Sequence, residues 1–308
     1  MEKWIEARVA YDSEDKSFAS DMISNIFYDI GLQGVVMEDP EVEVTEGWVD
    51  ETLHMPVQYA VIGYFPKDER AVNKCNLLEE KLSQLKLEMG IISQVVYRQI
   101  DSEDWTETWK AFFEPLKISD QIIIKPTWRE YHSAPGEIVI ELDPGMAFGT
   151  GSHPTTRLCI HMIERYLNRG ESFLDVGTGS GILLITAAKL GAKKGLGIDM
   201  DKEAVKLSRK NLVLNKIETS VFRIRTGTRI LSIKDRYDMV VANILPGVIL
   251  SLLDDMDHVL TPDGIFICSG FLEEHVDQIR EKLMRLSYAV LEERVKETWV
   301  AIAGTKRR

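Results

Sequence analysis

The hydrophobic pattern of the first hundred residues alternates between strand-like and helix-like stretches. Four stretches are short and apolar or alternating, as strands are: 3–10, 32–39, 55–66 and 91–100. Two longer stretches repeat apolar residues at helical spacing: 15–31 and 68–90. The order strand, helix, strand, strand, helix, strand is that of a ferredoxin-like sandwich, so we predict a small α+β domain over residues 1–100.

From residue 119 to the end, strand patterns and helix patterns follow one another. Two short strands, 121–131 and 136–143, are predicted to form a hairpin that opens a second domain. A helix is predicted to begin at Pro154, and from Phe173 onward buried strands alternate with helices. The alternation predicts an α/β fold for residues 119–308, a doubly wound, Rossmann-like sheet of seven strands whose last pair is antiparallel.

The segment between the two domains, residues 101–118, is predicted to be a linker helix. Asp101 or Ser102 can cap its first turn, and Pro115 would end it. Its four aromatic side chains are typical of a helix that packs on a neighbouring domain: Trp105, Trp109, Phe112 and Phe113.

The sequence FLDVGTGSG, residues 173–181, places three glycines between a buried strand and a helix. Gly177, Gly179 and Gly181 stand at alternate positions, where the lack of a Cβ lets a ligand approach the backbone. The nicotinamide pattern needs a third glycine where this chain has Ile182. Asp199 ends the next strand, where a carboxylate can accept hydrogen bonds from both hydroxyls of a ribose. The motif therefore predicts an adenosine-containing ligand.

Two more polar residues end strands at the same edge of the predicted sheet. Asp175 can fix the glycine-rich turn or meet an ammonium group, and Asn243 can cap its strand or accept a hydrogen bond from an amine. For methyl transfer from a sulfonium to nitrogen, alignment of the amine lone pair is most of what catalysis requires. No residue of the sequence is a committed general base, so Asn243 is the catalytic candidate.

Composition narrows the cellular setting. The chain has 308 residues, 44% of them hydrophobic and 28% charged, which is typical of a globular protein. Its longest apolar run, 239–253, is too short to cross a bilayer, and the first residues lack an export pattern. Three cysteines without metal-ligand spacing indicate reduced thiols and no metal site. We therefore expect a cytoplasmic protein that does not bind membranes.

The negative charge of the chain is concentrated in the first domain. Residues 1–100 carry 19 acidic and 9 basic side chains, whereas the rest of the chain carries 30 and 28. Seven of the acids lie in the run 38–51, which contains no basic residue. Such a domain repels nucleic acid and attracts basic partners, although a solvated acidic surface is the simpler interpretation.

Taken together, these motifs resemble the methyltransferases of ribosomal protein L11, the PrmA family. The most specific part is LDPGMAFGTGSHPTTRLC at 142–159, followed by FLDVGTGSG, by GIDMD at 197–201 and by VVANIL at 240–245. GLQGVVMED, DWTETWKAFFEPLKI and the closing WVAIAG are similar to the same family, so the resemblance spans nearly the whole chain.

The resemblance implies a cofactor, a substrate and contacts. S-adenosyl-L-methionine would be the methyl donor, and lysine side chains or the N-terminal amine of a large-subunit ribosomal protein would accept the methyl groups. The cofactor contacts implied by the family fall on Thr156, Gly177, Asp199 and Asn243, to which the turn adds Asp175 and Gly179. The basic substrate would dock on the acidic domain 1–100.

Two residues are expected on the substrate side. Phe148 is our candidate for aromatic cover of the target amine, because the residues after Asn243 supply no aromatic side chain. His153 can act as a base, as a ligand or as a hydrogen-bonding group that fixes the loop, and the last role is favoured.

Other functions stay open at this point. A methyltransferase of RNA or of another basic protein would share every cofactor motif, but the acidic first domain argues against RNA. A nicotinamide-linked oxidoreductase is disfavoured by the missing third glycine. A non-catalytic adenosine-binding partner of the ribosome is disfavoured by Asn243.

Overall fold

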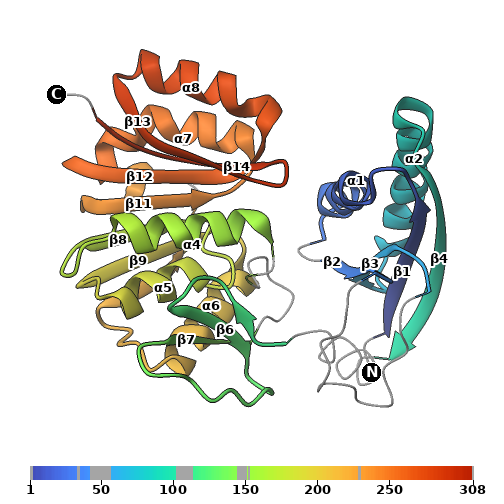
Figure 1. Cartoon of the computed structure of the whole chain (residues 1–308), viewed down its shortest axis with the longest axis horizontal. Coiled ribbons are helices and arrows are strands. Elements are labelled where there is room, and N and C mark those ends of the chain that lie inside the picture. Colours follow the sequence, from blue (N-terminus) through green and yellow to red (C-terminus); the bar gives the residue numbers. More distant parts are fainter. Residues whose placement is uncertain are drawn as a thin grey trace. The chain divides into compact units, whose positions relative to one another are not determined.

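The computed structural model describes residues 3–32, 35–41, 57–101, 114–143, 151, 153–227 and 230–306. The chain divides into two compact units, Met1–Phe113 and Glu114–Arg308 (Figure 1). The cut between them lies inside the segment that was predicted to be a linker. Each unit is described by itself.

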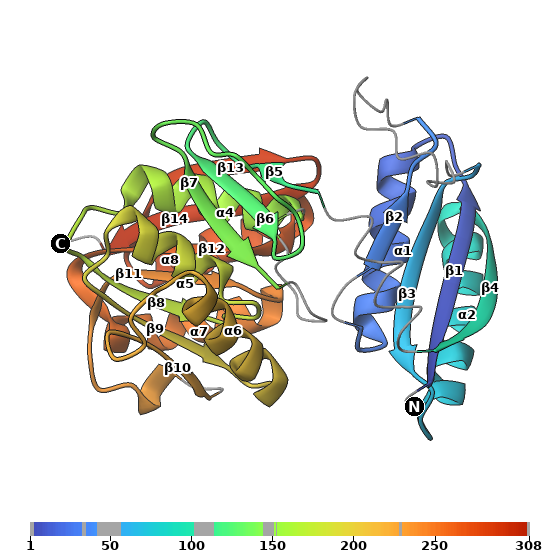
Figure 2. The ribbon, with the colours of Figure 1, turned by 90° about the horizontal axis from the view of Figure 1, so that it is seen from below.

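The first unit contains four strands and two helices. They are β1 (Lys3–Asp12), α1 (Lys16–Asp29), β2 (Val35–Glu38), β3 (Ala60–Pro66), α2 (Ala71–Met89) and β4 (Ile92–Asp101). All strand pairs are antiparallel and the order is β2-β3-β1-β4. Alternate strand residues such as Val9 and Phe65 face both helices in one core (Figure 2). The predicted ferredoxin-like domain is confirmed.

The second unit is built on a seven-stranded sheet with helices on both faces. Its strands are β8 (Ser172–Val176), β9 (Lys194–Asp199), β10 (Phe222–Thr226), β11 (Tyr237–Asn243), β12 (Leu260–Leu272), β13 (Tyr288–Lys296) and β14 (Trp299–Lys306). Its helices are α4 (Pro154–Tyr166), α5 (Ile182–Leu190), α6 (Lys202–Leu214), α7 (Pro246–Val259) and α8 (Val276–Arg285), with 3-10 turns at Ile230–Ser232 and Glu273–His275.

The order of the large sheet is β10-β9-β8-β11-β12-β14-β13, in which the pairs β12–β14 and β14–β13 are antiparallel and the other pairs are parallel. Helices α4, α5 and α6 cover one face, and α7 and α8 cover the other. Neighbouring residues of one strand face opposite cores, as Phe173 and Leu174 do in β8. The predicted doubly wound sheet is confirmed, and the carboxyl ends of β8, β9 and β11 meet at its switch point.

A smaller sheet precedes the large one, and it corrects the predicted hairpin. Its strands β5 (Leu116–Lys117), β6 (Ile122–Pro126) and β7 (Ile138–Leu142) stand in that order. β6 and β7 pair parallel, so the hairpin was wrong. The segment between them is long enough to cross over, and the antiparallel edge of β6 is taken by β5 after a short turn at Ser119.

The predicted linker helix is also wrong at both of its ends. Asp101 is the last residue of β4, and Leu116 and Lys117 form β5 with Ile124 and Ile123 of β6. Backbone groups there find hydrogen-bond partners in a sheet, which a helix through residue 118 would forbid. Residues 102–113 and their four aromatic side chains lie outside the described residues.

Cys75, Cys159 and Cys268 are free cysteines. No cluster of His, Cys, Asp and Glu in the described part of the chain is arranged to hold a metal ion. Among the described helices, none combines the length and the apolar character that a membrane crossing requires.

Candidate functional site

The glycine-rich turn runs from the end of β8 to the start of α5 in left-handed backbone conformations. Gly177, Gly179 and Gly181 have φ values of 77°, 52° and 85°, which residues with a Cβ rarely adopt. The Gly177 and Thr178 N–H groups donate to the Ile198 carbonyl at 2.9 and 3.0 Å. The turn is therefore fixed to the end of β9, and glycine is required by its conformation.

Close packing is a second reason for glycine at this edge. A Cβ on Gly177 would lie 2.4 Å from Cγ2 of Ile244, the residue after β11. A Cβ on Gly270 would lie 2.3 Å from the Ile244 carbonyl oxygen, and Gly270 has a φ of 100°. The ends of β8, β11 and β12 are thus held together around Ile244.

Asp199 stands at the carboxyl end of β9, as predicted. Its Oδ2 accepts the Gly179 N–H at 2.8 Å and its Oδ1 accepts the Asp201 N–H at 3.0 Å. Each carboxylate oxygen can accept a further hydrogen bond, and the side chain is only partly buried. Asp199 is therefore oriented by the turn and still able to accept bonds from a ligand.

Asp175 is fully buried and fixes the turn. Its Oδ2 accepts the Thr178 hydroxyl at 2.6 Å, whereas its Oδ1 has no hydrogen-bond partner among the described residues. The Thr178 hydroxyl and the Leu184 N–H both act to lower the pKa of this carboxyl. Burial, with a smaller contribution from the charge of Asp199, raises the pKa of Asp175 to about 7. Ionised Asp175 thus lacks a counter-charge in the described structure.

Asn243 ends β11 opposite Ser269 of β12, and Thr156 lies in the first turn of α4. Asn243 Oδ1 and Thr156 Oγ1 are both buried and have no hydrogen-bond partner among the described residues. α4 packs against both β11 and β12. If Asn243 only capped its strand, its side-chain oxygen would accept a hydrogen bond from a backbone N–H. Because Oδ1 has no such partner among the described residues, the capping interpretation of Asn243 is not supported.

Unpartnered buried atoms gather on the predicted site residues. Among the described residues, seven buried side-chain atoms lack a partner, and Thr156, Asp175 and Asn243 carry three of them. Leaving such an atom unpaired costs about 1–3 kcal/mol, so each is expected to have a function or a ligand. Together with Asp199 and the turn, they define a site for a polar ligand with several hydrogen-bonding groups.

His153 is the N-cap of α4. Its Nδ1 accepts the Thr155 N–H at 3.3 Å and lies 2.7 Å from the Thr155 hydroxyl oxygen, and its ring meets the Trp299 ring edge to face at 4.7 Å. Burial lowers the pKa of His153 to about 4, so the ring is neutral at neutral pH. This environment supports the favoured hydrogen-bonding role, and the substrate-side role stays a prediction.

Some predicted residues lie outside the described part, and others were missed. Phe148 falls in the segment 144–150, about which the structure says nothing. Thr178, which bonds Asp175, and Asn211, which bonds the turn at Ser180, were not among the predicted site residues. The i, i+4 spacing of Asn211 and Asn215 is visible in the sequence, but it does not identify their partners.

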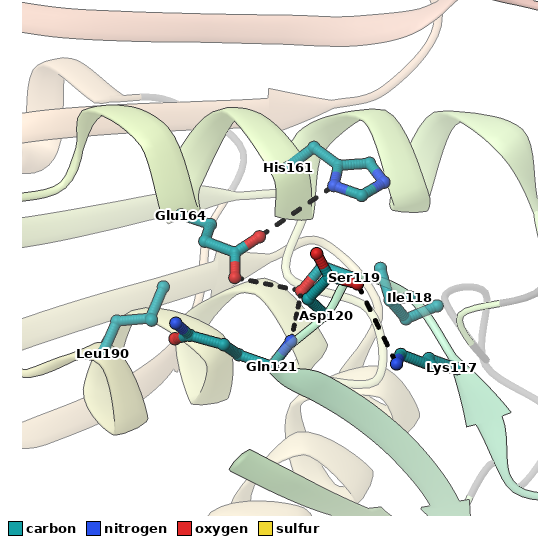
Figure 3. A pocket seen from close by; sticks show the side chains of 8 residues that line it. All are labelled: Lys117, Ile118, Ser119, Asp120, Gln121, His161, Glu164 and Leu190. Carbon is teal, nitrogen blue, oxygen red and sulfur yellow. Dashed lines mark hydrogen bonds and ion pairs between the residues drawn. The ribbon is translucent and has the colours of Figure 1, made fainter. Parts of the chain in front are cut away.

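A hollow of about 780 Å³ lies elsewhere in the second unit (Figure 3). It is lined by Lys117, Ile118, Ser119, Asp120, Gln121, His161, Glu164 and Leu190. Glu164 accepts the Ser119 hydroxyl at 2.9 Å within it. His161 and Leu190 lie toward the C-terminal halves of α4 and α5, whereas the turn and Thr156 lie at the N-terminal ends of these helices. The hollow is therefore separate from the candidate site.

Comparisons with known proteins agree with this geometry. The family model described as ribosomal protein L11 methyltransferase (PrmA) matches residues 3–307. A protein named ribosomal protein L11 methyltransferase from Desulfosudis oleivorans is 40% identical over 308 residues, 99% of each chain. One of the same name from Alkaliphilus oremlandii is 38% identical, over 98% of each chain. A crystal structure of ribosomal protein L11 methylase from Lactobacillus delbrueckii subsp. bulgaricus matches with a TM-score of 0.61 and 32% identity, over 64% of this chain and 100% of that chain.

The raised pKa of Asp175 leads to a prediction about stability. The carboxyl of Asp175 keeps its proton to a higher pH in the folded protein than in the unfolded chain. The stability that the protonated carboxyl contributes is therefore present below pH 4 and is lost as pH rises toward 7. Asp175→Asn, which carries no charge, should therefore be more stable than the wild type at pH 8, by on the order of 2–4 kcal/mol, and similar to it at pH 4. Urea unfolding without ligand at both pH values measures the difference.

Asp238→Asn is the matched control for this experiment. Burial alone would raise the pKa of Asp238, but hydrogen bonds from the Ser172 N–H and hydroxyl hold this pKa below its usual range. Loss of the Asp238 charge should therefore destabilise the protein at pH 8. A stability difference for Asp175→Asn that does not change with pH would contradict the assignment.

Proposed function

Since the chain belongs to the ribosomal protein L11 methyltransferase (PrmA) family, we propose that it transfers methyl groups from S-adenosyl-L-methionine to amino groups of ribosomal protein L11. The predicted family is confirmed, and the protein is a methyltransferase. The acceptors would be lysine side chains and the N-terminal amine. A ribosomal protein substrate supports a cytoplasmic location, where we expect the enzyme to act.

The unpartnered atoms of the site carry the proposal for the cofactor. S-adenosyl-L-methionine has a ribose, an ammonium group and a carboxylate, and it supplies a methyl group that is already activated on a sulfonium. Asp199 would accept hydrogen bonds from the ribose hydroxyls, and Asp175 Oδ1 would pair with the ammonium group. The Thr156 hydroxyl can donate to the carboxylate. The residues present therefore fit this cofactor.

Asn243 would align the acceptor nitrogen. Its Oδ1 is buried at the carboxyl end of β11 and accepts no hydrogen bond from the described residues, so it is available to an amine N–H. The positive sulfonium of the bound cofactor would disfavour an ammonium acceptor beside it and so favour the neutral amine that transfer requires. The chain then contributes orientation, which is the larger part of what an activated methyl group needs.

The first test is direct methylation. Incubation of the full-length enzyme with unmodified ribosomal protein L11 and S-adenosyl-L-methionine should raise the intact mass of the ribosomal protein in steps of one methyl group. Bulk tRNA offered in its place should stay unmodified, because the acidic first unit repels phosphate. Methylated tRNA with unchanged ribosomal protein would contradict the proposal and favour the RNA alternative.

Two substitutions should separate cofactor binding from turnover. Asp199→Ala removes the acceptor of the ribose hydroxyls and of the Gly179 N–H, so affinity for the cofactor should fall about 10–100-fold. Asn243→Ala should leave affinity within a few-fold and lower kcat about 100-fold, since it misaligns the amine. Calorimetry with S-adenosylhomocysteine and steady-state kinetics measure these effects.

Asp201→Ala provides the control for the Asp199 variant. It removes the same charge two residues away, together with a helix cap in which Asp201 Oδ1 accepts the Glu203 N–H. Equal cofactor binding by the wild type and Asp199→Ala would refute the ribose assignment.

We also propose that the acidic run 38–51 helps to dock the basic ribosomal protein. Replacing Glu41, Glu43 and Glu46 by Gln should raise KM for that protein about 3–10-fold at low salt and flatten its dependence on salt, because steering charges are lost. The kcat should not change.

A second triple variant tests whether the position of these charges matters. Glu79, Glu80 and Glu88 are exposed on α2, and their replacement by Gln changes the net charge of the first unit equally. The run 38–51 is not the docking site if both triple variants raise KM alike.

A further inference from the structure

The outer edge of β7 is bonded to side chains of α6 instead of to another strand. β7 is the last strand of the small sheet, and β6 occupies only its other edge. Asn211 and Asn215 of α6 are buried, with exposed fractions of 0% and 9%. A buried carboxamide must have its donors and acceptors satisfied, so the partners of these two side chains indicate what they do.

Asn215 bonds the middle of the β7 edge. Its Oδ1 accepts the Glu141 N–H at 2.9 Å, and its Nδ2 donates to the Glu141 carbonyl at 2.6 Å. A second bond from Nδ2 reaches the Asn211 carbonyl at 2.8 Å within the helix. This carboxamide thus pairs with one residue of β7 as a residue of a neighbouring strand would.

Asn211 bonds Asp143, two residues after Glu141, in the same way. Its Oδ1 accepts the Asp143 N–H at 3.0 Å, and its Nδ2 donates to the Asp143 carbonyl at 3.2 Å. The spacing matches because four helical residues advance about 6 Å and two strand residues about 6.6 Å. Two asparagines at i and i+4 can therefore bond alternate residues of a strand edge.

Asn211 differs from Asn215 in one bond. Its Nδ2 also donates to the carbonyl of Ser180 at 2.9 Å, inside the glycine-rich turn. α6 lies against the turn at this point, since a Cβ on Gly181 would lie 3.0 Å from Cβ of Ser208. One carboxamide thus joins the turn to Asp143, the residue that precedes the glycine-containing sequence 144–151.

We propose that Asn211 is a positioning residue that holds the glycine-rich turn in the conformation in which it binds cofactor. The inference rests on the function proposed above for the turn. The side-chain hydrogen bonds of Asn211 described here go to Asp143 and Ser180, not to a residue assigned to the cofactor. It acts by fixing the Ser180 carbonyl, whereas Asn215 bonds Glu141 of the strand and the backbone of α6.

The two asparagines form a matched pair for the test. Asn211→Asp and Asn215→Asp keep the shape and the acceptor oxygen, but each replaces the Nδ2 donor by an oxygen that faces two carbonyl oxygens. These carbonyls belong to Asp143 and Ser180 for Asn211 and to Glu141 and Asn211 for Asn215. In the full-length, cofactor-free protein, hydrogen exchange should become about tenfold faster in Asn211→Asp at the protected amides of Gly177, Thr178 and Gly181. The affinity for S-adenosylhomocysteine should fall about tenfold. In Asn215→Asp, both quantities should stay within about twofold of the wild type.

The exchange measurement keeps this inference separate from the proposed function. If the wild type fails to bind S-adenosylhomocysteine, the proposed function is wrong, but faster exchange in Asn211→Asp alone still supports the positioning role. Unchanged exchange in the turn, or equal exchange in both variants, overturns it. Should Asn211→Asp fail to fold, Asn211→Ser, which is too short to reach Ser180, is subject to the same two criteria.

Discussion

Three polar side-chain atoms are buried at the ends of β8 and β11 and in the first turn of α4 without a partner in the part of the chain that the structure describes. Their burial opposes folding by about 1–3 kcal/mol each, so the rest of the second unit must hold them in place. The two cores on either face of the large sheet supply that support, because neighbouring residues of β8, β11, β12 and β14 are buried in opposite cores. A site that binds a polar ligand tightly has to be partly unsatisfied before the ligand arrives.

Backbone contacts around Ile244 and Ser208 explain how the site keeps its shape. Gly177 and Gly270 each face Ile244 so closely that a methyl group would collide with it, and a methyl group on Gly181 would make a tight contact with Ser208. Any one of these contacts could relax by a small shift of the backbone. Three of them from different strands and helices leave the turn little freedom, which is how a loop without regular structure can present fixed N–H groups.

The sequence was sufficient to predict elements whose signals are local. Strands with alternating or continuous apolar residues, the order of the ferredoxin-like unit and the placement of Asp199 and Asn243 at strand ends follow from spacing along the chain. The parallel pairing of β6 and β7 could not be predicted, because it depends on which strand takes each edge of β6. The raised pKa of Asp175 depends on burial by helices distant in sequence. Asn211 was missed for a similar reason, since its partners are 31 and 68 residues away.

Polar side chains in this unit divide into two kinds by the state of their hydrogen bonds. Asn211 and Thr178 bond protein groups behind or within the turn, so their loss is expected to loosen it even when no ligand is present. Asn243 and Thr156 have buried oxygens left open, so their loss removes little from the folded protein. Apolar packing alone would hold the layers together but would tolerate small sliding movements, because it is not directional. Asn211 and Thr178 therefore fix the geometry of the site, whereas the open oxygens of Asn243 and Thr156 are left to contact the ligand or the acceptor amine.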